Sequence, residues 1–268
     1  MRPTVIIAVY KNVAALDIVF KSLERQTYKN FEVIVAEDGN CEEMANFISS
    51  YSSDFPIQHL TQEDDGWNKN AILNKAIVAA KTDWLIFVDG DCVLHSRFVE
   101  MHVRYAKKGR VLAGKRVKLD KDLSEYLMQD ISRITSIPKK IRKFLLPWKK
   151  GVGFVEEGFF INPDGFFGFI PKIRKMKVLK GCNMSFSKED VLLINGFDED
   201  YRLPAIGEDI DISWRFEAAG CKLFSLRNLA VEYHLHHKEN WSDQSINEAM
   251  MKEKMKENTY FCVKGIRK

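Results

Sequence analysis

The chain has 268 residues, 46% of them hydrophobic and 12% aromatic, with a formal net charge of +4 at pH 7. This composition supplies enough apolar side chains for a sizeable core and excludes the disordered and collagen-like classes of protein. The length fits one large α/β domain or two tightly joined lobes.

Predicted strands and helices alternate through the first third of the chain. Short apolar runs predict strands at residues 4–10, 31–37, 57–60 and 84–88. Helical spacing or helix-forming composition fills the gaps between them, at residues 16–23, 41–51 and 67–80. Strands that alternate with helices predict an α/β fold, in which a mostly parallel central sheet is covered by helices on both faces.

The alternation breaks between about residue 115 and residue 177, where four prolines interrupt basic and aromatic runs. We interpret residues 115–177 as an insertion in a single domain and not as a separate domain. The rest of that domain then comprises residues 1–114 and 178–240. A C-terminal helix and tail follow at residues 241–268.

Regular patterns return after the insertion. Ser187 and Asp190 have the spacing of a helix N-terminal capping box, and Gly220 follows the predicted end of a second helix. The predicted elements are a strand over 178–186, a helix that begins after the capping box, a helix over 208–219, a strand over 230–233 and an amphipathic helix near 242–257.

Acidic side chains follow the predicted strand at 84–88. Ligands of open parallel sheets bind beyond the carboxyl ends of the strands, and residues i and i+2 of an extended chain point the same way, so Asp89 and Asp91 can face one ligand. Gly90 between them removes a side chain that would block a close approach. Two carboxylates suit Mg²⁺ or Mn²⁺ beside the phosphates of a nucleotide. The alternative is a plain turn, because Asp-Gly is a favoured hairpin dipeptide.

Two further clusters are candidates for chemistry. Glu208 and Asp209 lie at the predicted start of a helix, where the helix dipole also favours carboxylates for structural reasons alone. His234 and His236 lie on one face if the preceding strand continues, and His237 follows them. The histidines could hold a metal ion, or they could be ordinary hydrogen-bonded polar residues; zinc is the weaker idea, because no cysteine or carboxylate stands at an obvious spacing.

Several segments, in this order, resemble glycosyltransferase family 2, whose members are inverting, nucleotide-sugar-dependent enzymes with a GT-A fold. The donor-side segments are Val5-Ile-Ile-Ala-Val-Tyr10, Val35-Ala-Glu-Asp-Gly39 and the D-x-D motif Asp89-Gly-Asp91. The acceptor-side segments are also similar to the C-terminal region of galactosyltransferases and of capsule polymerases, and they are Gly181-Cys-Asn-Met-Ser-Phe186, Asn195-Gly-Phe-Asp-Glu199 and Gly207-Glu-Asp209. The resemblance implies a Rossmann-like GT-A catalytic domain over residues 1–240. Its nucleotide-sugar half is then 1–114 and its acceptor half is 178–240.

The resemblance assigns the donor site residue by residue. It implies that Tyr10 packs against uracil, that Glu37 recognises the base and that Asp89 lies near the ribose. Lys69 and Asn70 would face the diphosphate or the sugar. The chain departs from the family at residues 8–11, which read Ala-Val-Tyr-Lys where Pro-Thr-Tyr-Asn is usual, and at residue 37, where an Asp is common.

The resemblance also assigns the metal ion and the chemistry. Asp91 would be the main ligand of Mn²⁺ or Mg²⁺, with His234 as a second ligand and His236 as the alternative. Asp209 would be the catalytic base, and Glu208 would hold the acceptor or donor sugar. The tryptophan that galactosyltransferases often place before Gly-Glu-Asp is absent here, so their substrates are not carried over.

These assignments predict an inverting, metal-dependent hexosyltransferase. It would move a hexose or N-acetylhexosamine from a UDP-sugar to a hydroxyl of a glycan or lipid-linked glycan in the synthesis of bacterial cell-surface polysaccharide or lipopolysaccharide. The alternative is a non-catalytic nucleotide-sugar-binding or scaffold protein, which would have no need of Glu208 and Asp209.

Charge is distributed unevenly along the chain. Residues 104–180 carry a net charge of +13, whereas the remainder carries −9. At residues 139–150, six Lys and Arg surround an apolar stretch that contains Trp148, a pattern typical of peripheral membrane contact. A solvated face or a groove for acceptor phosphate is the alternative. Nucleic acid is not an expected partner, because the aromatic residues form no evident stacking motif on strands.

Five scattered cysteines without a C-x-x-C pair favour a reducing compartment. The first apolar run, at residues 4–10, is too short for a signal peptide, and no run approaches the roughly 18 apolar residues of a membrane-spanning helix. We therefore expect a cytoplasmic protein, neither exported nor integral to a membrane, with possible peripheral contact at the inner face of the cytoplasmic membrane.

Overall fold

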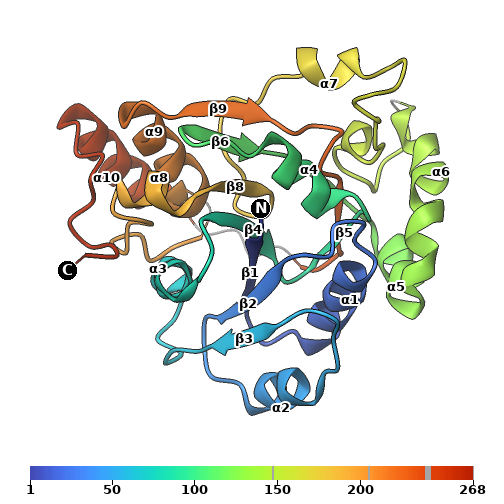
Figure 1. The fold of residues 1–268 in the computed structure, drawn as a ribbon, viewed down its shortest axis with the longest axis horizontal. Helices are drawn as coiled ribbons and strands as arrows, with labels where there is room; N and C mark the ends of the chain where they lie inside the picture. Colours follow the sequence, from blue (N-terminus) through green and yellow to red (C-terminus); the bar gives the residue numbers. More distant parts are fainter. Residues whose placement is uncertain (147, 205, 239–242, 268) are drawn as a thin grey trace.

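A computed structural model describes residues 1–146, 148–204, 206–238 and 243–267. Its main sheet has seven strands in the order β3-β2-β1-β4-β8-β6-β9 (Figure 1). Their bounds are Pro3–Val9 for β1, Glu32–Glu37 for β2, Ile57–Leu60 for β3, Trp84–Asp89 for β4, Arg110–Ala113 for β6, Met184–Ser187 for β8 and Lys222–Ser225 for β9. All neighbouring strands pair in parallel except β8, which is antiparallel to β4 and β6. The predicted mostly parallel sheet is confirmed.

Helices cover both faces of this sheet because alternate side chains of each buried strand point to opposite faces. Val5 and Ile7 of β1 pack in one core with α1 (Val13–Glu24), α2 (Glu42–Ser50) and α4 (Phe98–Tyr105). Ile6 packs in a second core with α3 (Lys69–Ala79), α8 (Lys188–Leu192) and α9 (Asp211–Ala218). The two-sided arrangement that the alternating sequence predicts is therefore confirmed.

A smaller sheet has the strand order β5-β10-β7. Its strands are β5 (Cys92–Leu94), β10 (Glu232–His234) and β7 (Arg116–Lys118). β10 pairs antiparallel with β5, so that His234 lies opposite Cys92, the residue after Asp91. The backbone N–H of Leu235 donates to the carbonyl of Asp91 at 2.9 Å. This sheet thus brings the end of β4 and the histidine segment together across more than 140 residues of sequence.

The insertion contributes a third core next to the small sheet. The insertion contains α5 (Lys121–Gln129), α6 (Ile137–Ile141) and α7 (Phe169–Ile173), together with short 3₁₀ turns. Leu127, Ile137 and Ile141 are buried against Val93 of β5 and Tyr233 of β10. The insertion is therefore packed onto the same body that carries the histidines.

Some predicted boundaries in the second half are wrong. The strand predicted over 178–186 begins only at Met184, because residues 181–182 form a turn. The helix predicted over 208–219 begins as a π-helical turn (Ile206–Ile210), and α9 follows it. Ser187 does cap α8, because its hydroxyl accepts from the N–H of Asp190 at 3.0 Å.

The C-terminal helix is α10 (Ser245–Lys256), slightly shorter than predicted, and the predicted start at residue 242 lies outside the described residues. No helix among the described residues combines the length and the hydropathy needed to cross a bilayer.

Candidate active site

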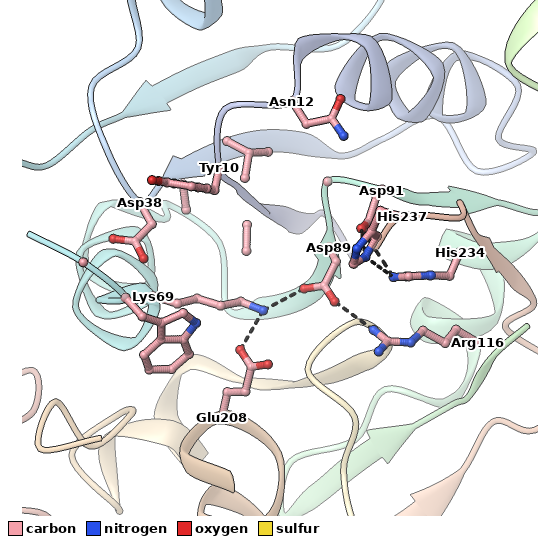
Figure 2. A pocket seen from close by; sticks show the side chains of 16 residues that line it. Tyr10, Asn12, Asp38, Lys69, Asp89, Asp91, Arg116, Glu208, His234 and His237 are labelled. Atoms are coloured by element: carbon pink, nitrogen blue, oxygen red, sulfur yellow. Dashed lines mark hydrogen bonds and ion pairs between the residues drawn. The ribbon is translucent and has the colours of Figure 1, made fainter. Parts of the chain in front are cut away.

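A pocket of about 660 Å³ lies at the carboxyl ends of β1, β2 and β4. Tyr10 follows β1, Asp38 follows β2, and Asp89 ends β4, as the topology of an open parallel sheet requires. The opposite wall comes from distant segments, with Arg116 from β7 and Glu208 from the π-helical turn (Figure 2). The sheet therefore gathers residues from both halves of the domain and from the insertion.

The turn after β4 separates the two aspartates of the D-x-D motif. A Cβ on Gly90 would lie 2.6 Å from Val9 Cγ1 and 3.1 Å from the Ala8 carbonyl. Glycine is required there because the turn lies directly against β1, and Gly90 also lines the pocket, so its role in the approach of a ligand stays a prediction. Asp89 and Asp91 both line the pocket, but each has its own set of partners.

Asp91 faces two histidines at one end of the pocket. A carboxylate oxygen of Asp91 lies 3.4 Å from His234 Nε2 and 3.2 Å from His237 Nε2, and the two imidazole nitrogens are 3.2 Å apart (Figure 2). Burial alone would raise the pKa of Asp91, but hydrogen bonds from both histidines hold it well below its usual range. One carboxylate and two imidazoles that lie within 4.8 Å of one another fit the donor set of a divalent transition-metal ion.

His237, and not His236, is the second histidine of this cluster. β10 ends at His234, so the assumption that the strand continues is wrong, and the i, i+2 alternation stops there. The His236 side chain is exposed and does not line the pocket. Three histidines in four residues signalled a site, but only the end of the strand decides which of them point into it.

An ion-pair network occupies the other end of the pocket. Lys69 Nζ lies 2.7 Å from an Asp89 oxygen and 2.6 Å from a Glu208 oxygen, and Arg116 Nη1 lies 3.2 Å from the second Asp89 oxygen (Figure 2). Burial would lower the pKa of Lys69, but the charges of Asp89 and Glu208 raise it well above its usual value. Burial raises the pKa of Glu208 to about 7, opposed by Lys69 and reinforced by Asp209 and Asp89. Lys69 therefore stands between two carboxylates, and Arg116 adds a second permanent cation beside Asp89.

Two predicted donor residues point away from the pocket. A Glu37 oxygen accepts from the N–H of Cys41 at 2.8 Å, and the other lies 2.8 Å from His59 Nε2, so this carboxylate is buried under β3. The Asn70 amide is also buried and donates to the Asp198 carbonyl at 2.7 Å. The structure thus uses both side chains to hold neighbouring segments in place.

Their sequence neighbours line the pocket instead. Asp38 accepts from the N–H of Asn68 at 2.8 Å and from Gln62 Nε2 at 2.7 Å, which presents its carboxylate beside Tyr10. Successive residues of a strand point to opposite sides, so a shift of one residue exchanges Glu37 for Asp38. This alternation could have indicated Asp38 as a pocket residue from the sequence alone.

Asp209 follows Glu208 in the π-helical turn. Its oxygens accept from the backbone N–H of Gly181 and lie 3.1 Å from Lys180 Nζ. Unlike Glu208, Asp209 does not line the pocket. π-Helical turns are frequent at functional sites, and here the turn presents neighbouring carboxylates to different surroundings.

Trp67 and Arg116 also line the pocket, and sequence reasoning missed both. Trp67 directly precedes the Asn-Lys-Asn segment at the start of α3, so its position was a usable signal. Arg116 belongs to the basic insertion, where nothing in the sequence distinguishes it from many other cations.

Comparison with known families agrees with this geometry. The family model described as glycosyl transferase family 2 matches residues 4–164, more than half of the chain. The chain belongs to glycosyltransferase family 2. A second model, described as the N-terminal domain of galactosyltransferase, matches residues 172–238, which include the π-helical turn and β10. The family assignment made from the sequence is confirmed.

This family 2 chain is similar to two bacterial chondroitin synthases. It is 26% identical to that of Pasteurella multocida over 94% of this chain and 27% of the relative. It is 27% identical to that of Escherichia coli over 90% of this chain and 36% of the relative. The chain thus spans only about a quarter to a third of these relatives.

The fold is that of solved glycosyltransferases. The mannosyltransferase PcManGT from Pyrobaculum calidifontis, in complex with GDP-Man and Mn²⁺, has a TM-score of 0.58 at 14% identity, covering 89% of this chain and 58% of that one. S. aureus TarS 1-349, in complex with UDP-GlcNAc, has a TM-score of 0.55 at 13% identity, covering 90% and 60%. The predicted GT-A fold is confirmed.

Proposed function

We propose that the protein is an inverting, metal-dependent glycosyltransferase that moves a hexose or N-acetylhexosamine from a UDP-sugar to a glycan or lipid-linked glycan. We place the reaction in the cytoplasm, in the synthesis of a bacterial cell-surface polysaccharide. The observation that carries the proposal is one pocket in which Asp91 and two histidines lie at one end and Lys69, Arg116 and Glu208 lie at the other. The sugar nucleotides bound to two solved neighbours and the chondroitin synthases support it.

The donor nucleotide fits the sheet side of the pocket. The Tyr10 ring is 53% exposed at the end of β1, which leaves a face on which a uracil ring can stack. The Asp38 carboxylate beside it can accept from the N–H of the base. We propose that Asp38 takes the base-recognition role first given to Glu37. Asp89, between Lys69 and Arg116, is left for the ribose.

The metal site favours Mn²⁺ over Mg²⁺. Mg²⁺ prefers an all-oxygen environment, whereas Asp91, His234 and His237 offer one oxygen and two nitrogens. When bound there, the ion would act as a Lewis acid toward the charge of the departing diphosphate. Lys69 and Arg116 can donate to the same phosphate oxygens, since both present their cationic groups beside carboxylates at the pocket wall.

The acceptor hydroxyl becomes a nucleophile when a carboxylate takes its proton. We propose Asp209 as that base; because it does not line the donor pocket, the acceptor hydroxyl would reach it from outside that pocket, where Gly181 and Lys180 fix the orientation of its carboxylate. Glu208 is held by Lys69 and, with a pKa near 7, is partly protonated at neutral pH, so it can both donate to and accept from a sugar hydroxyl. Attack from the side opposite the diphosphate would convert an α-linked UDP-sugar into a β-linked product.

A panel of UDP-sugars and GDP-mannose tests this function. We expect calorimetry to show binding of at least one UDP-sugar that requires Mn²⁺, and NMR to show slow hydrolysis that first releases the β-anomer. Tight binding without hydrolysis or transfer to any glycan acceptor would favour the non-catalytic alternative. Absence of binding to every sugar nucleotide would refute the proposal.

A further inference from the structure

An exposed aromatic loop stands apart from the active site. Phe166, Phe167, Phe169 and Ile173 are 88%, 59%, 54% and 69% exposed, all within eight residues. Burial of a large apolar side chain stabilises a protein by about 1.5–3 kcal/mol, and the fold leaves these four side chains largely exposed. Phe166 and Phe167, whose ring centroids are 5.1 Å apart, also border a hollow of about 450 Å³ with a mostly apolar lining, which extends the apolar surface toward Phe160 and Ile170. A contiguous exposed patch of this kind marks an interaction surface.

The loop is held firmly in this position. The Asp164 carboxylate receives two hydrogen bonds from Arg104, at 2.6 and 2.5 Å. The N–H of Gly168 donates to the Gly165 carbonyl at 2.9 Å, and a Cβ on Gly168 would lie only 2.2 Å from the Pro163 carbonyl. These contacts define one tight turn, and in Figure 1 the helix that follows it, α7, lies at the upper edge of the molecule. The exposure of the phenylalanines is therefore built into the loop.

The charge around the loop indicates its partner. Residues 165–188 contain six Lys and Arg and no Asp or Glu, and Lys172, Lys175 and Lys177 are exposed. The three acidic residues nearest in sequence on the N-terminal side are all paired with arginines, Asp164 with Arg104 and Glu156 and Glu157 with Arg174 and Arg227. The surface beside the aromatic rings is thus strongly cationic.

We propose that this loop docks the protein on a bilayer containing anionic phospholipid, with Phe166, Phe167 and Phe169 entering the boundary between headgroups and acyl chains. Lys172, Lys175 and Lys177 then meet the headgroup phosphates. Aromatic rings next to basic side chains are the combination that binds such a surface. A symmetric contact with a second copy would instead bring two cationic surfaces together, which opposes it.

The loop is distinct from the membrane segment predicted at residues 139–150. There, Leu145, Leu146 and Trp148 are 52%, 43% and 72% exposed, but Ile141 is buried in the third core, as is Ile137 just before the segment. Membrane contact at 139–150 stays a prediction, and a charge-reversal variant of that segment serves as a comparison. The aromatic loop exposes four large apolar side chains, against three among the described residues of 139–150.

Co-sedimentation of the full chain with vesicles tests the proposal. We expect the protein to bind vesicles of phosphatidylcholine with phosphatidylglycerol. Its affinity for vesicles of pure phosphatidylcholine should be lower by about tenfold or more. The triple variant Phe166→Ser, Phe167→Ser, Phe169→Ser should lose about tenfold or more in affinity. A matched variant, Ile246→Ser with Val263→Ser, removes side chains that are 70% and 77% exposed elsewhere and should bind as the unchanged protein does.

Two further measurements keep the outcomes separate. Hydrolysis of a UDP-sugar without vesicles should be equal in the triple variant and in the unchanged protein, which reports correct folding and tests the proposed function independently. Equal vesicle affinity of the triple variant, or lack of vesicle binding by the unchanged protein, would overturn the docking proposal. The same holds if light scattering shows an aromatic-loop-dependent dimer that does not bind vesicles.

Discussion

The two ends of the pocket are suited to ligands of opposite charge. At one end, Asp91 faces His234 and His237, which carry no permanent positive charge, so this end is suited to a cation from solution. At the other end, Lys69 and Arg116 bring permanent charges to Asp89 and Glu208, so this end is suited to an anion. A metal–diphosphate pair has the complementary arrangement. Two carboxylates two residues apart in one motif can therefore serve different ligands.

The largest expected effect comes from the base. Asp209→Asn should lower the transfer rate by about a thousandfold, because the acceptor proton then lacks its carboxylate acceptor. Affinity for the UDP-sugar, measured by calorimetry with Mn²⁺ present, should change little, because Asp209 does not line the pocket. Glu208→Gln is the companion variant. If Glu208→Gln alone abolished transfer while Asp209→Asn retained it, the two roles would have to be exchanged.

The metal end can be broken separately. Asp91→Ala should lower Mn²⁺-dependent affinity for the nucleotide by about a hundredfold, because the only carboxylate of the three-residue cluster is lost. His236→Ala is the matched control and should leave affinity unchanged, since that side chain is exposed and outside the pocket. Titration of each variant with Mn²⁺ at a fixed concentration of UDP measures both effects. Equal losses in the two variants would contradict the assignment of His237 over His236.

The ion-pair end has a pH signature. The pKa of Glu208 is about 7 in the folded protein against 4.5 as the ordinary value, so between these limits the folded state binds more protons than the unfolded state. Its contribution to stability must therefore fall as pH rises from about 4.5 to 7 and level off above that. Relative to the Glu208→Gln variant, the free energy of unfolding of the unchanged protein should fall by about 2 kcal/mol over this pH window. Urea unfolding of both proteins at several pH values measures this difference. If the free energy of unfolding had the same pH dependence in both proteins, the raised pKa of Glu208 would be refuted.

The smallest effect distinguishes two adjacent acids. Asp38→Asn should weaken UDP binding by about tenfold, the value of one hydrogen bond to a charged group. Glu37→Gln should leave UDP affinity within about twofold and mainly lower the melting temperature, because its partners are Cys41 and His59. Calorimetry with UDP and thermal unfolding separate the two. The reverse pattern would return base recognition to Glu37.

Sequence reasoning predicted much of the frame and part of the site. The alternating β-α-β order, the cap at Ser187 and the convergence of Asp91 with His234 agree with the structure. The pairing of β10 with β5, which produces this convergence, has no local signal, because it depends on contacts more than 140 residues apart. Arg116 was not predictable either, because nothing in the sequence distinguishes it from the other cations of the insertion, and only the pairing of β7 with β10 brings it to the pocket.

The sequence by itself determined the fold class, the family and most of the segments that form the pocket, because hydrophobic periodicity and short polar motifs are local properties of the chain. Only the tertiary structure decided which of two neighbours faces the pocket: Asp38 over Glu37, Lys69 over Asn70, and His237 over His236. The physical reason is that strands and turns end at particular residues, and one residue of shift reverses the direction of a side chain. Where an element ends depends on what packs against it.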